Sequence, residues 1–359
     1  TKGVLSGSGS TYTIPVTPTT EGAVTVQVPA AAAQNSFSTD NLASNTISVN
    51  YDTTAPTATV TAPAGPTQDT SLNFGITFSE VVTGLTATAG DIQVVNGTMG
   101  ALTGSGNTYN LVVTPSGQGP VTVRVNAGAA QDNAGNGNTV SNVGSVTFDT
   151  VGPTPTVTVA ATTNANPIIF TITFNEAVTG FTSGSLNVTN GAVGALSGSG
   201  TTYTIPVTPA GQGPVTLAVQ ASAAQDAAGN NSDASNTAST IFDDVVPTCV
   251  VTSSASATNA QPVVFTFTFS EPVTGLTAAA VSVTGGTKGA LSGSGTTYTL
   301  PVTPSGALVT VTAEVPQGSA SDAAGNLNAD SNQLSVLYDT QAPSATVTAP
   351  AATAARQPL

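Results

Sequence analysis

Large apolar side chains alternate with small or polar ones in short stretches along the whole chain. In residues 72–78 they occupy every second position, and the same pattern recurs in residues 168–174 and 263–269. A period of two is typical of a β-strand with one buried face, and the abundant Thr and Val suit a pleated surface. Gly-Ser-Gly and Asn-Gly sequences, which favour hairpin turns, separate these stretches. The Ala-rich stretches 30–33 and 221–224 are too short for helices, so the pattern predicts an all-β fold.

A repeated phrase sets the length of the structural unit. Variants of Gly-Ala-Leu-Ser-Gly-Ser-Gly-Thr-Thr-Tyr recur four times, and their tyrosines are Tyr12, Tyr109, Tyr203 and Tyr298. Successive tyrosines are 97, 94 and 95 positions apart, so the period is about 95 residues. A repeat of this size can bury a core of its own, unlike the units of roughly 20 to 50 residues found in solenoids and propellers.

Seven short strands are expected in one complete repeat. In the copy that follows residue 52 they fall at 57–61, 72–78, 91–95, 101–103, 108–113, 121–126 and 145–148. Seven alternating strands with turn signals between them indicate an antiparallel immunoglobulin-like (Ig-like) β-sandwich. The chain has one Cys and no Trp, so it lacks the Cys-Trp-Cys signature of antibody domains and any internal disulfide.

The phase of the repeat divides the chain into tandem domains. We expect a partial Ig-like repeat with C-terminal strands only at 1–52, complete repeats at 53–149, 150–243 and 244–340, and the start of a further repeat or a tail at 341–359. Residues 344–348 match a first strand, and the partial repeat lacks its first three strands. We therefore expect the chain to be a slice of a longer array, whose partial repeat folds only if another segment supplies the missing strands.

Composition and charge exclude several classes of protein. The 359 residues include 4 Lys plus Arg, 18 Asp plus Glu and no His, which gives a formal net charge of -14. Nucleic-acid binding needs clustered basic residues and is not expected. Without His there is no imidazole base and no Ser-His-Asp or Cys-His pair, so we expect no enzyme, no catalytic residues and no organic cofactor. No apolar run approaches the roughly 18 residues of a membrane span.

The acidic residues concentrate at three positions of the repeat. A Glu follows the second strand, an Asp stands in Asp-x-Ala-Gly-Asn after the sixth strand, and an Asp ends the last strand. These residues are Glu80, Glu176 and Glu271; Asp132, Asp226 and Asp322; and Asp52, Asp149, Asp243 and Asp339. The partial repeat departs from the pattern, with Asn35 at the second position. In a sandwich the second and sixth strands run toward the pole where the linker arrives, so we expect one residue of each kind to converge there.

Three converging carboxylates repel one another unless a cation joins them. The predicted metal ligands are Asp52, Glu80 and Asp132; Asp149, Glu176 and Asp226; and Asp243, Glu271 and Asp322. Oxygen ligands without His or Cys select a hard cation such as Ca²⁺, and Asn136, Asn230 and Asn326 offer further oxygens. The alternative is that each acid only caps a turn. A glycosidase-type carboxylate pair is disfavoured, because an active site is not normally copied into every domain.

Four landmarks in fixed order carry a resemblance. Phe-Ser-Glu-x-Val-Thr-Gly, the Gly-Ser-Gly phrase, Asp-x-Ala-Gly-Asn and Asp-Thr-x-x-Pro together resemble the bacterial Ig-like tandem repeats of large surface adhesins and biofilm-associated proteins. The resemblance implies tandem domains in a long stalk, calcium at the domain junctions, and an extracellular or cell-surface location.

The sequence thus predicts a structural stalk or spacer of a secreted bacterial surface adhesin or biofilm protein, stiffened by Ca²⁺ at its junctions. Its expected partners are the neighbouring Ig-like repeats. The alternative is a subunit of an extracellular filament or surface layer, in which strand complementation joins copies of the same chain. The adhesion target stays open.

Overall fold

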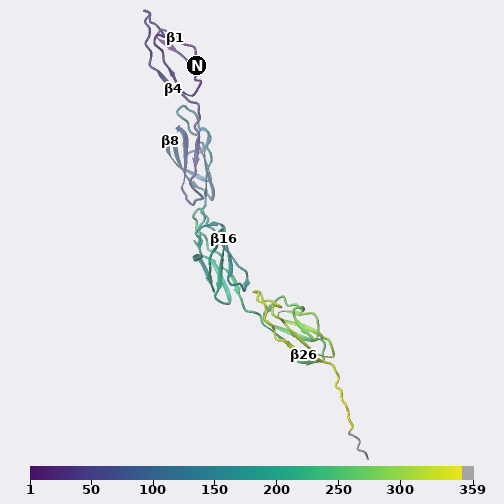
Figure 1. Cartoon of the computed structure of the whole chain (residues 1–359). Coiled ribbons are helices and arrows are strands. Elements are labelled where there is room, and N and C mark those ends of the chain that lie inside the picture. The colour runs from purple at the N-terminus through teal and green to yellow at the C-terminus, as the bar shows by residue number, and fades with distance from the viewer. Residues whose placement is uncertain (350–359) are drawn as a thin grey trace, which may run out of the picture. The chain divides into compact units, whose positions relative to one another are not determined.

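A computed structural model describes residues 1–349 of the chain (Figure 1). These residues form strands and loops, with a single turn of 3-10 helix, η1 (Ser183–Ser185), and the predicted all-β fold is confirmed. By its internal contacts the chain divides into two compact units. The first unit is Thr1–Pro153 with Gln225–Ser232, and the second is Thr154–Ala224 with the chain from Asp233 onward. Within residues 1–349, no helix is long and apolar enough to cross a membrane.

The complete repeat of the first unit is a sandwich of two sheets. Its strands are β5 (Ala58–Thr61), β6 (Leu72–Val82), β7 (Ile92–Val95), β8 (Gly97–Pro115), β9 (Gly119–Val125) and β10 (Gly144–Phe148). One sheet has the order β5-β6-β8 and the other the order β10-β9-β7. The strands predicted at 101–103 and 108–113 both belong to β8, which turns back on itself where Gly106 has a φ of 72°. A Cβ atom on Gly104 would lie 2.4 Å from the carbonyl oxygen of Thr108, so only Gly lets the two limbs approach.

The second unit holds two further sandwiches. The third repeat contains β11 (Pro155–Thr158), β12 (Thr162–Thr163), β13 (Ile168–Val178), β14 (Leu186–Thr189), β15 (Gly191–Val193), β16 (Ser197–Pro209), β17 (Gly213–Val219) and β18 (Ala238–Phe242). The fourth contains β19 (Cys249–Ser253), β20 (Ala257–Thr258), β21 (Val263–Val273), β22 (Ser282–Thr284), β23 (Gly286–Lys288), β24 (Ser292–Pro304), β25 (Leu308–Glu314) and β26 (Leu334–Asp339). Their sheets are β11-β13-β16-β15 with β12-β18-β17-β14, and β19-β21-β24-β23 with β20-β26-β25-β22.

One short strand in each repeat departs from the predicted antiparallel pairing. β12 pairs in parallel with β18, and β20 pairs in parallel with β26. In the second repeat Thr67 makes the equivalent parallel bridge to Phe148. This segment continues the first strand after it has crossed to the opposite sheet, which the alternation of apolar residues did not indicate because it is only two residues long.

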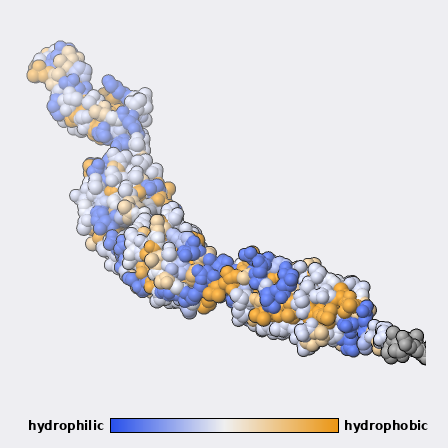
Figure 2. Space-filling view, turned by 60° about the horizontal axis from the view of Figure 1, so that its bottom comes forward, coloured by the Kyte–Doolittle hydropathy of each residue, from blue (hydrophilic) through white to orange (hydrophobic). Residues whose placement is uncertain are grey.

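Each complete repeat buries a core of its own. In β6 the side chains of Phe74 and Ile76 are 0% exposed, and they belong to the same core as Val121 and Val123 of β9. Separate cores in the third and fourth repeats contain the equivalent aromatic residues of β13 and β21. Alternate residues of a strand point to the same face, so the period-two pattern places these side chains between the sheets. Hydrophobic residues also reach the surface, scattered among hydrophilic ones (Figure 2).

Residues 1–52 form two two-stranded sheets rather than a sandwich. Their strands are β1 (Ser6–Ser8), β2 (Thr11–Thr13), β3 (Gly22–Val26) and β4 (Ile47–Tyr51). These residues include no equivalents of β5, β6 and β7, so the apolar face of β4 is uncovered. Val49 is 67% exposed, whereas its counterpart Val146 in β10 is 4% exposed.

Residues 341–349 contain no strand, although the sequence predicts one at 344–348. Val347 is 96% exposed. A first strand pairs with the second strand of its own repeat, as β5 does with β6, and the described residues after 340 offer no such partner. Residues 350–359, the rest of the predicted further repeat or tail, lie outside the described residues.

The repeated tyrosine holds the end of the second strand in place. The Oη atom of Tyr298 donates a hydrogen bond of 2.8 Å to the carbonyl oxygen of Val273, and its ring packs edge-on against Phe269. Between Thr268 and Val273 the register of β21 against β24 shifts, which makes a bulge. Glu271 lies in this bulge. Tyr109 and Tyr203 bond the carbonyl oxygens of Val82 and Val178 in the same way.

A buried hydroxyl distinguishes the third core from the others. Thr240 in β18 is 1% exposed, and its Oγ1 atom has no hydrogen-bond partner within the described part of the chain. The same position holds Val146 in the second repeat and Val336 in the fourth. An unpaired buried hydroxyl costs free energy that a methyl group of similar size does not.

We expect Thr240→Val to raise the free energy of unfolding of the third repeat by about 1 to 2 kcal/mol. Urea unfolding followed by circular dichroism measures the change. The reverse substitution, Val336→Thr, is the control and should lower the stability of the fourth repeat. A Thr240→Val protein that is less stable than the wild type contradicts the assignment of an unpaired hydroxyl.

Candidate metal centres

The glutamate of the first acidic group stands in a bulge. Glu80 lies between Thr77 and Val82 of β6, where the register against β8 shifts. The sequence placed Glu80 just past the second strand, but the strand continues through the bulge to Val82. In a bulge the side chains no longer alternate strictly between the two faces. This frees the carboxylate of Glu80 to point away from the core, and the side chain is half-buried.

The aspartate of Asp-x-Ala-Gly-Asn is held by its own loop. Asp132 is 6% exposed, and its Oδ1 atom accepts hydrogen bonds of 2.8 Å from the backbone N–H groups of Ala134 and Asn136. Its Oδ2 atom accepts a bond of 2.8 Å from Asn136 Nδ2. The predicted turn-capping role is therefore present. Two carboxylate oxygens offer about four lone-pair sites, so these three bonds leave room for a further ligand.

The aspartate of the linker is fixed by two contacts. Asp52 Oδ1 accepts a hydrogen bond of 3.0 Å from the backbone N–H of Thr54. The carbonyl oxygen of Asp52 accepts a bond of 3.1 Å from Asn136 Nδ2. Asn136 therefore joins the linker to the same loop that holds Asp132, and it brings the two aspartates together.

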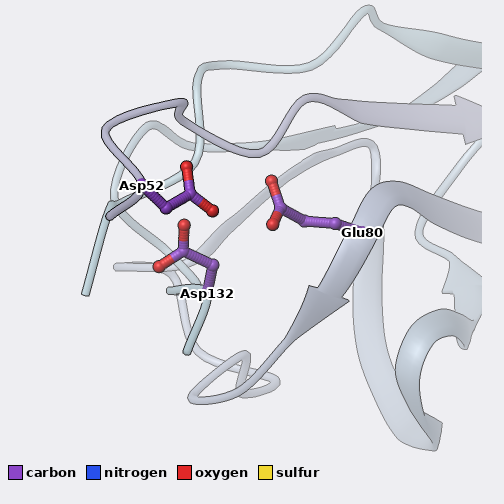
Figure 3. A group of neighbouring side chains, drawn as sticks. All are labelled: Asp52, Glu80 and Asp132. Atoms are coloured by element: carbon purple, nitrogen blue, oxygen red, sulfur yellow. The ribbon is translucent and has the colours of Figure 1, made fainter. Parts of the chain in front are cut away.

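The three carboxylates of the first group face one another (Figure 3). Asp52, Glu80 and Asp132 each offer one oxygen, and these oxygens all lie within 4.8 Å of one another. A hollow of about 280 Å³ lined by Asp52, Glu80 and Asn50 lies at the group. In the second unit, Asp243, Glu271 and Asp322 likewise each offer one oxygen, and these three oxygens lie within 4.8 Å of one another. The convergence expected from sandwich topology is present in both groups.

The second junction carries the same residue types. In the first unit, Asn230 Nδ2 donates a hydrogen bond of 3.0 Å to the carbonyl oxygen of Asp149 and one of 2.8 Å to Asp226 Oδ2. Glu176 belongs to the second unit, where it lies in the equivalent bulge of β13, between Thr173 and Val178.

Burial and like charge act together on the glutamates. Burial, and then the negative charges of Asp132 and Asp52, raise the pKa of Glu80 above its ordinary value of 4.5. The pKa of Glu271 is raised by burial and by its two aspartate neighbours. Burial also acts to raise the pKa of Asp132, but the hydrogen bonds from its loop outweigh this and lower the pKa. A raised folded-state pKa means that the charged glutamate is disfavoured, so its contribution to stability diminishes as the pH rises through that pKa.

The donor set fits a hard divalent cation. Each of the two groups supplies three carboxylates and no nitrogen or sulfur ligand, and Ca²⁺ takes six to eight oxygens, including backbone carbonyls and water. The asparagines that the sequence suggested as extra oxygen donors also make hydrogen bonds of their own. Asn326 uses its Nδ2 atom for Asp322 and for the carbonyl oxygen of Asp243, and its Oδ1 atom accepts a bond of 3.0 Å from Asn164. These asparagines bridge chain segments.

Sequence reasoning missed a second set of linker contacts. The Glu or Gln that precedes the Gly at the start of β3, β9 and β17 bonds the residues after the linker aspartate. Glu21 accepts hydrogen bonds from Thr53 and Thr54, and Gln118 bonds Thr150. The recurrence of Glu-Gly or Gln-Gly at one position of the repeat was the available signal.

Comparison with known families identifies the chain. The model of a family described as "Bacterial Ig-like domain" matches residues 52–148, 149–241 and 243–338. These matches cover most of the chain, and the chain belongs to this family of bacterial Ig-like domains. The resemblance drawn from the four sequence landmarks is thereby confirmed, as are the three tandem repeats of about 95 residues.

Solved structures of several tandem-domain proteins are similar to this chain at low sequence identity. Invasin, a bacterial integrin-binding protein, is 16% identical with a TM-score of 0.32, and the similarity covers 73% of this chain and 56% of that one. The chain thus spans little more than half of the invasin structure. A tetra-tandem repeat from the extending region of a large adhesion protein is 20% identical with a TM-score of 0.27, over 89% of this chain and 82% of the other.

Domains 1–6 of the surface layer protein SbsC are 13% identical with a TM-score of 0.21, over 81% of this chain and 55% of that one. No curated protein has significant sequence similarity to the chain.

We expect Asn136→Ala to lower the free energy of unfolding of the second repeat by about 1 to 3 kcal/mol, because buried Asp132 and the Asp52 carbonyl both lose a donor. Urea unfolding measures the loss. Asn133→Ala is the matched control, since Asn133 lies exposed in the same loop, and it should be nearly neutral. Equal effects of the two substitutions would show that the bridge contributes nothing.

Proposed function

We propose that the chain is a structural spacer of a secreted or surface-exposed bacterial protein, that Ca²⁺ stiffens the junctions between its Ig-like domains, and that it catalyses no reaction. One observation carries this proposal. In two acidic groups, one carboxylate from a linker and two from the following repeat bring their oxygens within 4.8 Å of one another. Asp149, Glu176 and Asp226 occupy the same positions of the repeat in the sequence.

An ion at such a group links the linker to the repeat that follows it. Without an ion, the carboxylates repel one another and the junction is held only by hydrogen bonds. With an ion, the linker can no longer move independently of the repeat, because both are bound to the same centre. A spacer needs this property, since a flexible linker would let each domain tumble separately.

The same chemistry supports an extracellular location. Weak calcium sites in extracellular modules have dissociation constants of about 0.1 to 1 mM, so they need a surrounding calcium concentration of that order. The absence of His and the shortage of basic residues support a role without catalysis or nucleic-acid binding. A bacterial surface stalk or biofilm component fits these properties and the family.

We expect calcium to stabilise the chain and to keep it extended. At a free calcium concentration ten times the dissociation constant, each site should add about 1.4 kcal/mol to the free energy of unfolding of its repeat. Calorimetry in calcium and in EDTA measures the shift in melting temperature, and small-angle scattering measures the length. If neither the melting temperature nor the length changes with calcium, the proposal is wrong.

Glu80→Gln tests a single site in this experiment. The substitution removes a disfavoured charge, so in EDTA at pH 7 the protein should be at least as stable as the wild type. In calcium, titration calorimetry should find one site fewer. Asp69→Asn removes one negative charge outside the acidic groups and should keep the wild-type number of sites. If Asp69→Asn also lost one calcium site, calcium binding would depend only on the net charge of the protein.

A further inference from the structure

One buried side chain in the second unit contacts three separate segments of the chain. Asn326 is 8% exposed. Its Nδ2 atom donates hydrogen bonds of 2.8 Å to Asp322 Oδ2 and to the carbonyl oxygen of Asp243, and its Oδ1 atom accepts one of 3.0 Å from Asn164 Nδ2. Asn164 belongs to the third repeat, Asp243 to the linker and Asp322 to the fourth repeat. A single amide therefore joins both repeats and the linker between them.

The linker is also held from the side of the third repeat. The side chain of Gln212 hydrogen-bonds the side chain of Asp244, and the backbone N–H of Asp244 donates a bond of 3.3 Å to Gln212 Oε1. Asp243 and Asp244 are consecutive, so the linker is fixed on both sides. None of these bonds involves an ion.

The bond from Asn164 to the loop of the following repeat has an equivalent at the preceding junction. Thr67 and Thr163 both pair with the last strand of their own repeat. The residue after each, Gln68 or Asn164, reaches the Asp-x-Ala-Gly-Asn loop of the next repeat. Gln68 Nε2 donates a bond of 3.3 Å to the carbonyl oxygen of Gly229. If the Asp-x-Ala-Gly-Asn loop only formed a turn within its own repeat, it would not need a bond from the preceding repeat. Gln68 and Asn164 both make such a bond.

These bonds differ from the acidic group in their dependence on solution conditions. Buried hydrogen bonds are directional, and a partner left unpaired costs about 1 to 3 kcal/mol. They persist when calcium is removed, whereas carboxylates that share an ion then repel one another. Fixing the Asp243 backbone also restricts where its carboxylate can lie, which lowers the ordering cost of ion binding.

We propose that Asn164 and Asn326 are the positioning residues of this junction, and that they set the arrangement of the two repeats before any ion binds. Calcium then strengthens a junction whose geometry already exists. The statement about calcium rests on the proposed function, whereas the statement about the hydrogen bonds does not.

Distances between spin labels test this inference on the full chain. Cys249 is replaced by Ala, the residue at the same core position of the second repeat, and labels are attached at Thr208→Cys and Thr303→Cys, which are exposed in the third and fourth repeats. We expect a narrow distance distribution in EDTA that calcium leaves at the same mean. Circular dichroism verifies that both repeats are folded.

Asn164→Ala removes the bond between repeats and leaves the bonds of Asn326 to Asp322 and Asp243 in place. We expect it to broaden the distribution in EDTA at least twofold. Asn164→Gln should restore a narrow distribution, because Gln68 makes the equivalent contact. Asn259→Ala is the matched control: Asn259 follows the equivalent Thr258 of the last repeat, is exposed, and should leave the distribution unchanged.

The inference is wrong if the wild-type distribution in EDTA is as broad as that of Asn164→Ala, or if Asn164→Ala broadens nothing. Titration calorimetry on the same samples separates the two proposals. A narrow distribution in EDTA together with no calcium binding would reject the calcium sites and support the hydrogen-bonded junction. Calcium binding together with a broad distribution in EDTA would do the reverse.

Discussion

Electrostatic repulsion at the linker is the constraint around which the junctions are built. In each of two acidic groups, three carboxylates lie with oxygens within 4.8 Å of one another, and burial strengthens their mutual repulsion. The fold meets this cost locally. Asp132 and Asp322 receive hydrogen bonds from their own loops, while Glu80 and Glu271 have raised pKa values. A chain with few charges has placed many of its acids where they disfavour the ion-free state, and a bound cation would reverse that effect.

The turn and ligand roles of Asp132 are compatible. Its loop needs a carboxylate to accept the backbone N–H groups of Ala134 and Asn136, and this need would keep an Asp at the position without any metal. The same bonds orient the carboxylate toward Asp52. Turn capping would therefore preorganise Asp132 for the proposed ion, so the two interpretations that the sequence left open do not exclude each other.

Two kinds of interaction act on each linker. The hydrogen bonds of Asn136, Asn230 and Asn326 join it to the following repeat, while Glu21, Gln118 and Gln212 hold it from the preceding one. In the proposed function, the carboxylates add a response to cations. A spacer of that kind would take its geometry from the hydrogen bonds and an adjustable strength from the charges.

The sequence alone determined the strands, the period and the identity of the acidic residues, because alternation and repetition are properties of residue order. It also predicted convergence of the acids, since sandwich topology places particular loops at one pole. Only the tertiary structure decided that Glu80 lies in a bulge closed by Tyr109, that Asn326 bridges three chain segments, and that Thr240 is buried without a partner. These features depend on contacts between residues far apart in the chain, and local periodicity carries no information about which side chain a distant amide will meet.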